Sequence, residues 1–157
     1  MISIRKYQHG DELALRNIFF NTIRQVNIRD YSECQVRAWA PDDYDENAWS
    51  RRMRSNKPFI ALIEDQIVGF SDVQEDGYID HFFCHNEHQG KGVGKALMQT
   101  LVETGLNKGI TRFYSHVSIT AKPFFEHFGF VVVKKQRVDI LGQVLNNYVM
   151  EKHCELS

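Results

Sequence analysis

A glycine-rich stretch just before an apolar helix-like segment places the strongest constraint on how this chain folds. Residues 88–98 read HQGKGVGKALM, with a glycine at every second position from Gly90 to Gly94. One glycine is enough for a tight turn from a strand into a helix, so three indicate that the backbone itself must approach a partner closely. Successive main-chain amides at the positive end of a helix bind anions, phosphates above all. We therefore expect a phosphate-binding loop here.

Two common nucleotide-binding loops do not fit this stretch. A Walker A loop has four residues between its glycines and then Lys-Ser/Thr, but three residues separate Gly90 from Gly94, and Lys95 precedes Ala96. A dinucleotide fingerprint needs a further glycine where Lys95 stands, and an acidic residue after the next strand. The strand expected at 112–117 has no acidic end. Both loops are excluded.

A third pattern, Gln/Arg-x-x-Gly-x-Gly/Ala, fits QGKGVG from Gln89 to Gly94 at every fixed position. Farther on, SITAKPFFEHFGF from Ser118 to Phe130 fits much of the pattern Asn-x-x-Ala-x-x-Phe-Tyr-x-x-x-Gly-Phe. With these two stretches, residues 59–149 resemble the GNAT superfamily of N-acetyltransferases, and in particular its small, bacterial-type, single-domain members. The N-terminal third is similar to the family only in the order of its elements.

The resemblance implies acetyl-CoA as the co-substrate, with its pyrophosphate held by the loop, and no metal. The loop residues assigned to CoA are Gln89, Gly90, Lys91, Gly92, Val93, Gly94 and Lys95. In the family the preceding strand is bulged and splays from the next one, which leaves backbone groups free for the pantetheine arm and the thioester oxygen. The amides near Phe83 and Cys84 are therefore expected to form an oxyanion site.

The second stretch departs from the family pattern at two positions that bear on chemistry. Ser118 stands where the family often has asparagine, and Phe125, which we also place at the cofactor site, stands where it has tyrosine. That tyrosine commonly protonates the departing thiolate of CoA, and Phe125 has no proton to give. Either Tyr148, on the last expected strand, acts as the acid, or the thiolate leaves unassisted, for which a thiol pKa of about 8.5 is compatible.

Transfer to an amine also requires a base, because an amine with a pKa near 10.4 is mostly charged at neutral pH. Asp80 is the first candidate, acting through a water, although a carboxylate there is equally interpreted as a solvated strand residue. His81 and His116 are the alternatives. No covalent intermediate is required, so Cys84 is interpreted as a small, half-buried strand residue before it is interpreted as a nucleophile.

Aromatic residues in the N-terminal third mark the expected acceptor site. Tyr31 and Trp39, with Tyr44 and Trp49 nearby, lie where the family binds its amine substrate. They line a pocket for the amine of a small molecule or peptide, or they simply pack the helices onto the sheet.

A histidine-rich run in the middle of the chain raises the question of a metal. His81, His85 and His88 lie close to Cys84 in sequence, but a strand leading into a loop does not bring these spacings to one side. No metal is expected.

The remaining composition is that of one ordinary globular domain spanning residues 1–157, with 43% hydrophobic residues and a formal net charge of -1. Three cysteines without metal spacing favour the cytoplasm. There is no signal-peptide-like start or membrane-length apolar run, and no basic field for nucleic acid. We expect a monomer or homodimer with no nucleic-acid or membrane partner.

Hydrophobic periodicity predicts a mixed, mostly antiparallel sheet with helices on both faces, in the α/β or α+β class. Helices are expected at 11–28, from Ser32, at 46–54, at 93–106 and around Pro123. Strands are expected at 2–5, 59–63, 67–73, 78–85, 112–117, 130–140 and 143–152.

Two other functions remain open from the sequence. A catalytically silent acyl-CoA sensor fits the absence of an evident acid. A toxin-like acetyltransferase acting on charged tRNA conflicts with the near-neutral charge.

Overall fold

The computed structural model describes residues 1–155. Its elements run from a first strand through three helices into the sheet, and then alternate between strands and helices. In chain order they are β1 (Ile2–Lys6), α1 (Glu12–Gln25), a 3₁₀ turn (Asn27–Arg29), α2 (Glu33–Trp39), α3 (Glu46–Asn56), β2 (Phe59–Ile63), β3 (Gln66–Ser71), β4 (Tyr78–Ile79), β5 (Phe82–Cys84), α4 (Val93–Asn107), β6 (Arg112–Ser118), α5 (Lys122–His127), β7 (Val131–Ile140) and β8 (Gln143–His153).

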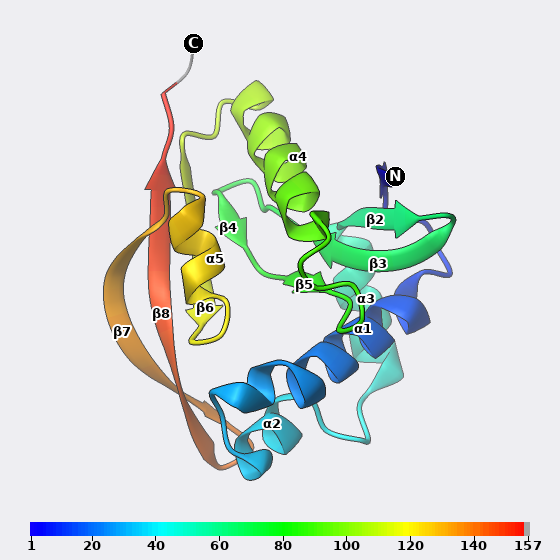
Figure 1. Ribbon diagram of the computed structural model, residues 1–157, viewed down its shortest axis with the longest axis vertical. Helices are drawn as coiled ribbons and strands as arrows, with labels where there is room; N and C mark the ends of the chain where they lie inside the picture. The colour runs from blue at the N-terminus through cyan, green and yellow to red at the C-terminus, as the bar shows by residue number, and fades with distance from the viewer. Residues whose placement is uncertain (156–157) are drawn as a thin grey trace.

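The strands form two four-stranded sheets that meet in the middle of the molecule (Figure 1). The first sheet has the order β1-β2-β3-β5 and the second the order β4-β6-β8-β7. Every pair of neighbouring strands in the described chain is antiparallel except β4 with β6. The mixed, mostly antiparallel architecture predicted from the sequence is confirmed.

Helices cover both faces of the sheets, because strand residues alternate in direction and each face is apolar. On one face, Ile60 and Phe70 pack with α1 and α3 in the largest core cluster. On the other face, Ala61 and Val68 pack against Val93 and Leu97 of α4. Helix α5 lies on the α4 side, over the second sheet (Figure 1).

Local sequence signals mark the starts of two helices, α2 and α5. The hydroxyl of Ser32 accepts the amide of Gln35, and the Gln35 side chain accepts the amide of Ser32, so the predicted capping box starts α2. Pro123 lies in the first turn of α5, as predicted. The first helix is shorter than expected, since the α-helix ends at Gln25 and a 3₁₀ turn follows.

The strand expected at 78–85 is interrupted at Asp80 and His81. The amides of these two residues donate to the carboxylate of Asp72, at 2.8 and 3.3 Å, and not to a neighbouring strand. As a result β4 pairs with β6, while β5 pairs with β3 on the other side. The chain crosses from one sheet to the other at this break, and β5 and β6 are left unpaired with each other.

The adjacent rings of β5 face opposite sides of the sheet, which explains why this strand does not alternate in polarity. Phe83 contacts Phe19 and Phe70 on the α1 side. Phe82 contacts Phe124 and Phe125 on the α5 side. β5 is therefore the edge strand of the first sheet, with aromatic packing on both of its faces.

Within residues 1–155, no helix combines the length and the apolar character that crossing a membrane requires.

Candidate functional site

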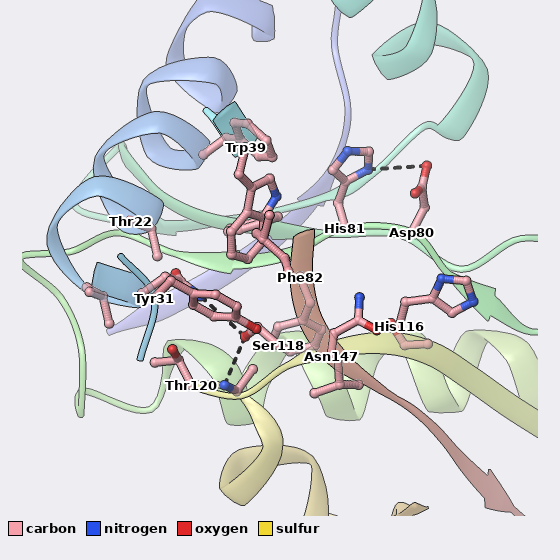
Figure 2. Close-up of a pocket in the computed structure, with 18 of the residues that line it drawn as sticks. Thr22, Tyr31, Trp39, Asp80, His81, Phe82, His116, Ser118, Thr120 and Asn147 are labelled. Carbon is pink, nitrogen blue, oxygen red and sulfur yellow. Dashed lines mark hydrogen bonds and ion pairs between the residues drawn. The ribbon is translucent and has the colours of Figure 1, made fainter. Parts of the chain in front are cut away.

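A cavity of about 690 Å³ opens where the two sheets separate. Its walls come from α1, the break between β4 and β5, the end of β6, the start of α5 and the β7–β8 hairpin. In Figure 2, Asp80 and His81 lie on one wall, and His116, Ser118 and Asn147 lie on the facing wall. The cavity joins the two regions that the sequence assigned to cofactor and acceptor.

The glycine-rich loop leads directly into α4. Gly90 and Gly92 have φ angles of 75° and 86°, a region that side chains disfavour, and Gly92 is the N-cap of the helix without a side-chain hydrogen bond. Gly94 has a different role, because a Cβ there would lie 2.7 Å from the Phe124 ring. The amides of residues 89–95 donate to no acceptor in the described chain. They are free to bind an anion.

The side chain of Gln89 fixes this loop to the preceding strand. Its Nε2 atom donates to the carbonyl oxygen of Cys84 at 2.9 Å, and Gln89 alone among the predicted loop residues lines the cavity. Lys91 and Lys95 are exposed, and they bring positive charge near the N-terminus of α4 because they belong to the loop. The Lys91 ammonium lies 3.5 Å from Nδ1 of His88.

Backbone groups of β5 face the cavity on its unpaired edge. The amide of His85 donates to Val68, and His81 accepts from Asp72, so alternate residues between them point toward β3. Phe83 therefore turns its amide toward β3, and Cys84 turns its amide toward the cavity. Of the two amides expected at the oxyanion site, only that of Cys84 is available.

Burial makes the Cys84 thiol unreactive. Loss of water around the side chain raises the pKa of Cys84 to about 12, so the thiol stays protonated at neutral pH. Its carbonyl oxygen accepts from the Thr22 hydroxyl at 2.8 Å, which holds α1 against β5.

Asp80 and His81, two of the three candidate bases, belong to one hydrogen-bonded cluster at the break in the strand. Nδ1 of His81 lies 3.0 Å from a carboxylate oxygen of Asp72, which is fully buried, and 3.6 Å from Asp80 (Figure 2). Asp80 also accepts from the guanidinium of Arg52 at 2.7 Å and from the Asn56 amide at 2.8 Å. Both Asp80 and His81 line the cavity.

Opposing effects act on the Asp80 carboxyl. Burial alone raises its pKa, but the His81 ring, Arg52 and Asn56 together outweigh burial and lower the pKa below the ordinary value. Asp80 is therefore an ionised partner of neighbouring donors. The Asp72 carboxylate orients the His81 ring through its Nδ1 atom.

The candidate acid Tyr148 does not line the cavity. Tyr148 packs on the α5 side of the second sheet, where the ammonium of Lys122 lies 5.2 Å from the ring centroid. Its neighbour toward the hairpin, Asn147, lines the cavity instead. Phe125 is buried and lines the cavity.

Three of the four N-terminal aromatic residues line the cavity: Tyr31, Trp39 and Trp49. The Tyr31 hydroxyl donates to the carbonyl of Asn146 at 2.6 Å and accepts from the amide of Ile119 at 2.9 Å. Tyr31 therefore has a structural role in addition to its place at the cavity. Tyr44 lies outside the lining and packs over Arg16.

Sequence reasoning missed several polar lining residues, among them Arg16, Thr120 and Asn147. Each of these three has a buried side-chain atom without a hydrogen-bond partner in the described chain. Arg16 had a detectable signal, because it interrupts the apolar stripe of α1 next to Leu15 and Phe19. Nothing in the sequence marks Thr120, just after β6, or Asn147, whose position depends on the pairing of β6 with β8.

The histidine-rich run does not form a ligand set. In residues 1–155, the one group of potential metal ligands within 4.8 Å of one another is Asp72, Asp80 and His81. The hydrogen bonds of this group go to Arg52, Asn56 and main-chain amides.

Comparisons with known proteins agree with the fold. A family model described as an acetyltransferase (GNAT) domain matches residues 27–151. The N-acetyltransferase YafP of Escherichia coli strain K12 is 38% identical over 149 residues, which is 95% of this chain and 94% of the relative. The crystal structure of a GCN5-related N-acetyltransferase from Rhodopseudomonas palustris has a TM-score of 0.92 and 30% identity, covering 96% of this chain and 94% of its own.

The PaiA N-acetyltransferase of Thermoplasma acidophilum, solved in complex with coenzyme A, shares the fold at 21% identity. Its TM-score is 0.75, and the alignment covers 98% of this chain and 99% of that one. The family model covers most of the chain, and the E. coli relative is similar over nearly all of it. The chain therefore belongs to the GNAT family of acetyltransferases.

Proposed function

We propose that the chain transfers an acetyl group from acetyl-CoA to the primary amine of a small molecule, by direct attack while both are bound. The observation that carries this proposal is the row of free amides at the start of α4, next to a cavity lined by an Asp-His pair. An anion site and a base in one cleft are the two groups that acetyl transfer from a CoA thioester to an amine requires.

In the proposed cofactor site, the amides of residues 89–95 hold the pyrophosphate, and Lys91 and Lys95 add positive charge. What supports this is the N-terminus of α4, which is uncapped and ends in residues of positive φ. The pantetheine arm follows the unpaired edge of β5. Phe125 lines the part of the cavity between that edge and α5.

In the proposed chemistry, His81 accepts the proton of the amine and Asp72 holds the ring in place. Asp80 remains a candidate for the base, acting through a water, and its negative charge is already compensated by Arg52. The amide of Cys84 donates to the thioester oxygen as negative charge develops there. Since Phe125 has no hydroxyl and Tyr148 lies outside the cavity, we propose that the thiolate leaves without an acid from the protein.

The same proposal places the activity in the cytoplasm, in a single domain acting without nucleic acid or a membrane. It is supported by three free thiols and a formal net charge of -1. Whether the chain is a monomer or a homodimer does not alter the proposed chemistry.

Thiol release from acetyl-CoA across a panel of primary amines tests the proposal. We expect turnover with at least one small amine, and a fall of kcat/KM by about 100-fold in His81→Gln, since general base catalysis contributes on this scale. Asp80→Asn and His116→Gln serve as matched variants, each changing one other candidate base. A larger loss in either of them than in His81→Gln would reassign the base.

The alternative function, a silent acyl-CoA sensor, has its own signature in this assay. It predicts tight CoA binding with no thiol release for any amine. What keeps this candidate is that Phe125 stands where the family has its tyrosine.

A further inference from the structure

Arg16 is a buried cation at the cavity with no partner of its own. It lies on the inner face of α1, is 8% exposed, and lines the cavity. No hydrogen bond or ion pair among residues 1–155 includes its guanidinium, and its Nε atom is buried without a partner. A charge held in this way lacks the compensation that buried ions normally have.

Three aromatic rings lie close to the Arg16 guanidinium and determine which of its groups a ligand can reach. Its central carbon lies 4.0 Å from the ring centroid of Tyr44, 4.8 Å from Phe19 and 5.1 Å from Trp49. Rings of this kind stabilise a cation through its flat face but accept none of its N–H groups. The N–H groups in the plane of the guanidinium are therefore left to a ligand.

The carboxylates near this end of the cavity are already used. Asp80 accepts from Arg52, and Glu12 accepts from Tyr7. Burial accordingly lowers the pKa of Arg16 without a carboxylate to oppose it. Arg52 gives the contrast within the same cavity, because its side chain is 55% exposed and paired with Asp80. Among the described residues that line the cavity, Arg16 has the one guanidinium without a partner, and this is the group that a free anion can bind.

Arg16 lies close to the proposed base. The rings of Phe19 and Trp49, which contact Arg16, also contact the ring of His81, with centroid separations of 6.5 and 5.6 Å. A carboxylate on Arg16 and an amine at His81 would therefore belong to one small molecule. A long peptide is not needed to connect them.

We propose that Arg16 binds the carboxylate of the acceptor, so that the substrates are small amines that carry a carboxylate, such as amino acids. This inference rests on the proposed acetyl transfer and names its substrate class. The planar guanidinium matches a carboxylate with two parallel hydrogen bonds, which a lysine at this place would not provide.

The experiment compares matched pairs of acceptors: each amino acid with its amide and with the amine that remains when the carboxylate is removed. We expect wild-type kcat/KM to be about 10- to 100-fold higher for the acid of each pair, the range expected for hydrogen bonds to a charged group. Arg16→Gln and Arg16→Lys should lose this preference through KM, and should keep turnover of the neutral amines. Arg51→Gln on α3 is the control, since Arg51 is exposed and lies outside the cavity lining.

Two outcomes would overturn the inference. One is equal kcat/KM for the acids and their neutral partners in the wild-type protein, a readout that stands even where an Arg16 variant fails to fold. The other is a stronger preference for O-phosphoethanolamine than for any carboxylate, which would make the site a phosphate site.

Calorimetric binding separates failure of this inference from failure of the proposed function. If no amine is acetylated but N-acetylated amino acids bind wild-type protein about 10-fold more tightly than their amides, the anion site stands without the transfer reaction. If amines are acetylated but acids and amides bind alike, the reaction stands and the Arg16 site does not.

Discussion

Burial lowers the reactivity of Cys84, a cysteine that lines the cavity. Cys84 and Cys34 are both free thiols, but Cys84 is enclosed by the sheet and α4, whereas Cys34 is exposed on α2. Because only a thiolate attacks an electrophile, exposure and pKa together set the rate of alkylation. Because Cys84 stays protonated, in the proposed reaction the amine and not this thiol is the group that attacks the thioester.

We predict that iodoacetamide at pH 7.5 modifies Cys34 and spares Cys84. The pKa of Cys84 is raised to about 12 by burial, so the thiolate fraction at this pH is negligible. Peptide mass spectrometry over a time course measures both sites in one sample, with Cys34 as the internal control. After unfolding in urea the two should react at similar rates.

Modification of native Cys84 as fast as that of Cys34 would contradict the prediction. It would also reopen a covalent route for the transfer, which the sequence alone left as an alternative.

At the scale of elements, the decisive feature is the N-terminus of α4. The helix has 15 residues, and its first amides are free because no side chain caps it. Gly92 sets this geometry through its φ of 86°, while the space where its Cβ would lie holds only the end of Ile2 at 3.7 Å. A side chain at Gly92 would strain the backbone and extend into the space before the loop.

We predict that Gly92→Val lowers CoA affinity by at least about 10-fold, since it disturbs several hydrogen bonds to a charged group at once. Calorimetric titration with CoA measures the change. Gly109→Val is the matched control, because Gly109 has a φ of 83°, open space around its Cβ position, and a place just beyond the other end of α4. Both variants should lose stability by a similar amount, of about 1–2 kcal/mol.

Equal CoA affinity in Gly92→Val and Gly109→Val would show that the loop does not hold the diphosphate. The assignment of the anion site to residues 89–95 would then be wrong, and the proposed function would lose the observation that supports it.

The sequence predicted elements better than it predicted their interruptions. Apolar periodicity and the caps at Ser32 and Pro123 located the helices, because these signals are local. The break at Asp80 and His81 depends on the Asp72 carboxylate, which is far enough away in sequence to leave no pattern. The sequence likewise does not show which residues of β8 line the cavity: Asn147 does, and Tyr148 does not.

At the scale of the whole molecule, the two sheets of the described chain are not joined by strand pairing across the cavity. The chain crosses between them at residues 80–81, and β5 and β6 do not pair. α4 covers one face, packing on the first sheet and, through Met98 and Leu101, on the second. On the opposite face, Tyr31 connects the helical N-terminal third to the second sheet. The contacts of α4 on one face and of Tyr31 on the other hold the two sheets in place around the cavity.

We predict that Tyr31→Phe lowers the free energy of unfolding by about 1–3 kcal/mol, the cost of leaving buried hydrogen-bonding groups unpaired. The substitution keeps the ring against Trp39 but removes the hydroxyl that joins the carbonyl of Asn146 to the amide of Ile119. Urea unfolding followed by circular dichroism gives the change. Tyr44→Phe is the control, because the Tyr44 hydroxyl forms no hydrogen bond within residues 1–155, and it should change stability by less than about 0.5 kcal/mol.

The same variant separates the two roles that the sequence left open for Tyr31. If the residue acts mainly by fixing the second sheet, CoA affinity should change little under conditions where the protein is fully folded, because the Tyr31 hydroxyl bonds to Asn146 and Ile119 and to no residue of the loop at 89–95. The acceptor KM should rise instead, since Asn146 and Asn147 line the wall that this hydroxyl holds. Stability equal to that of Tyr44→Phe would mean that packing alone keeps the sheets apart, with no contribution from this hydrogen-bonded bridge.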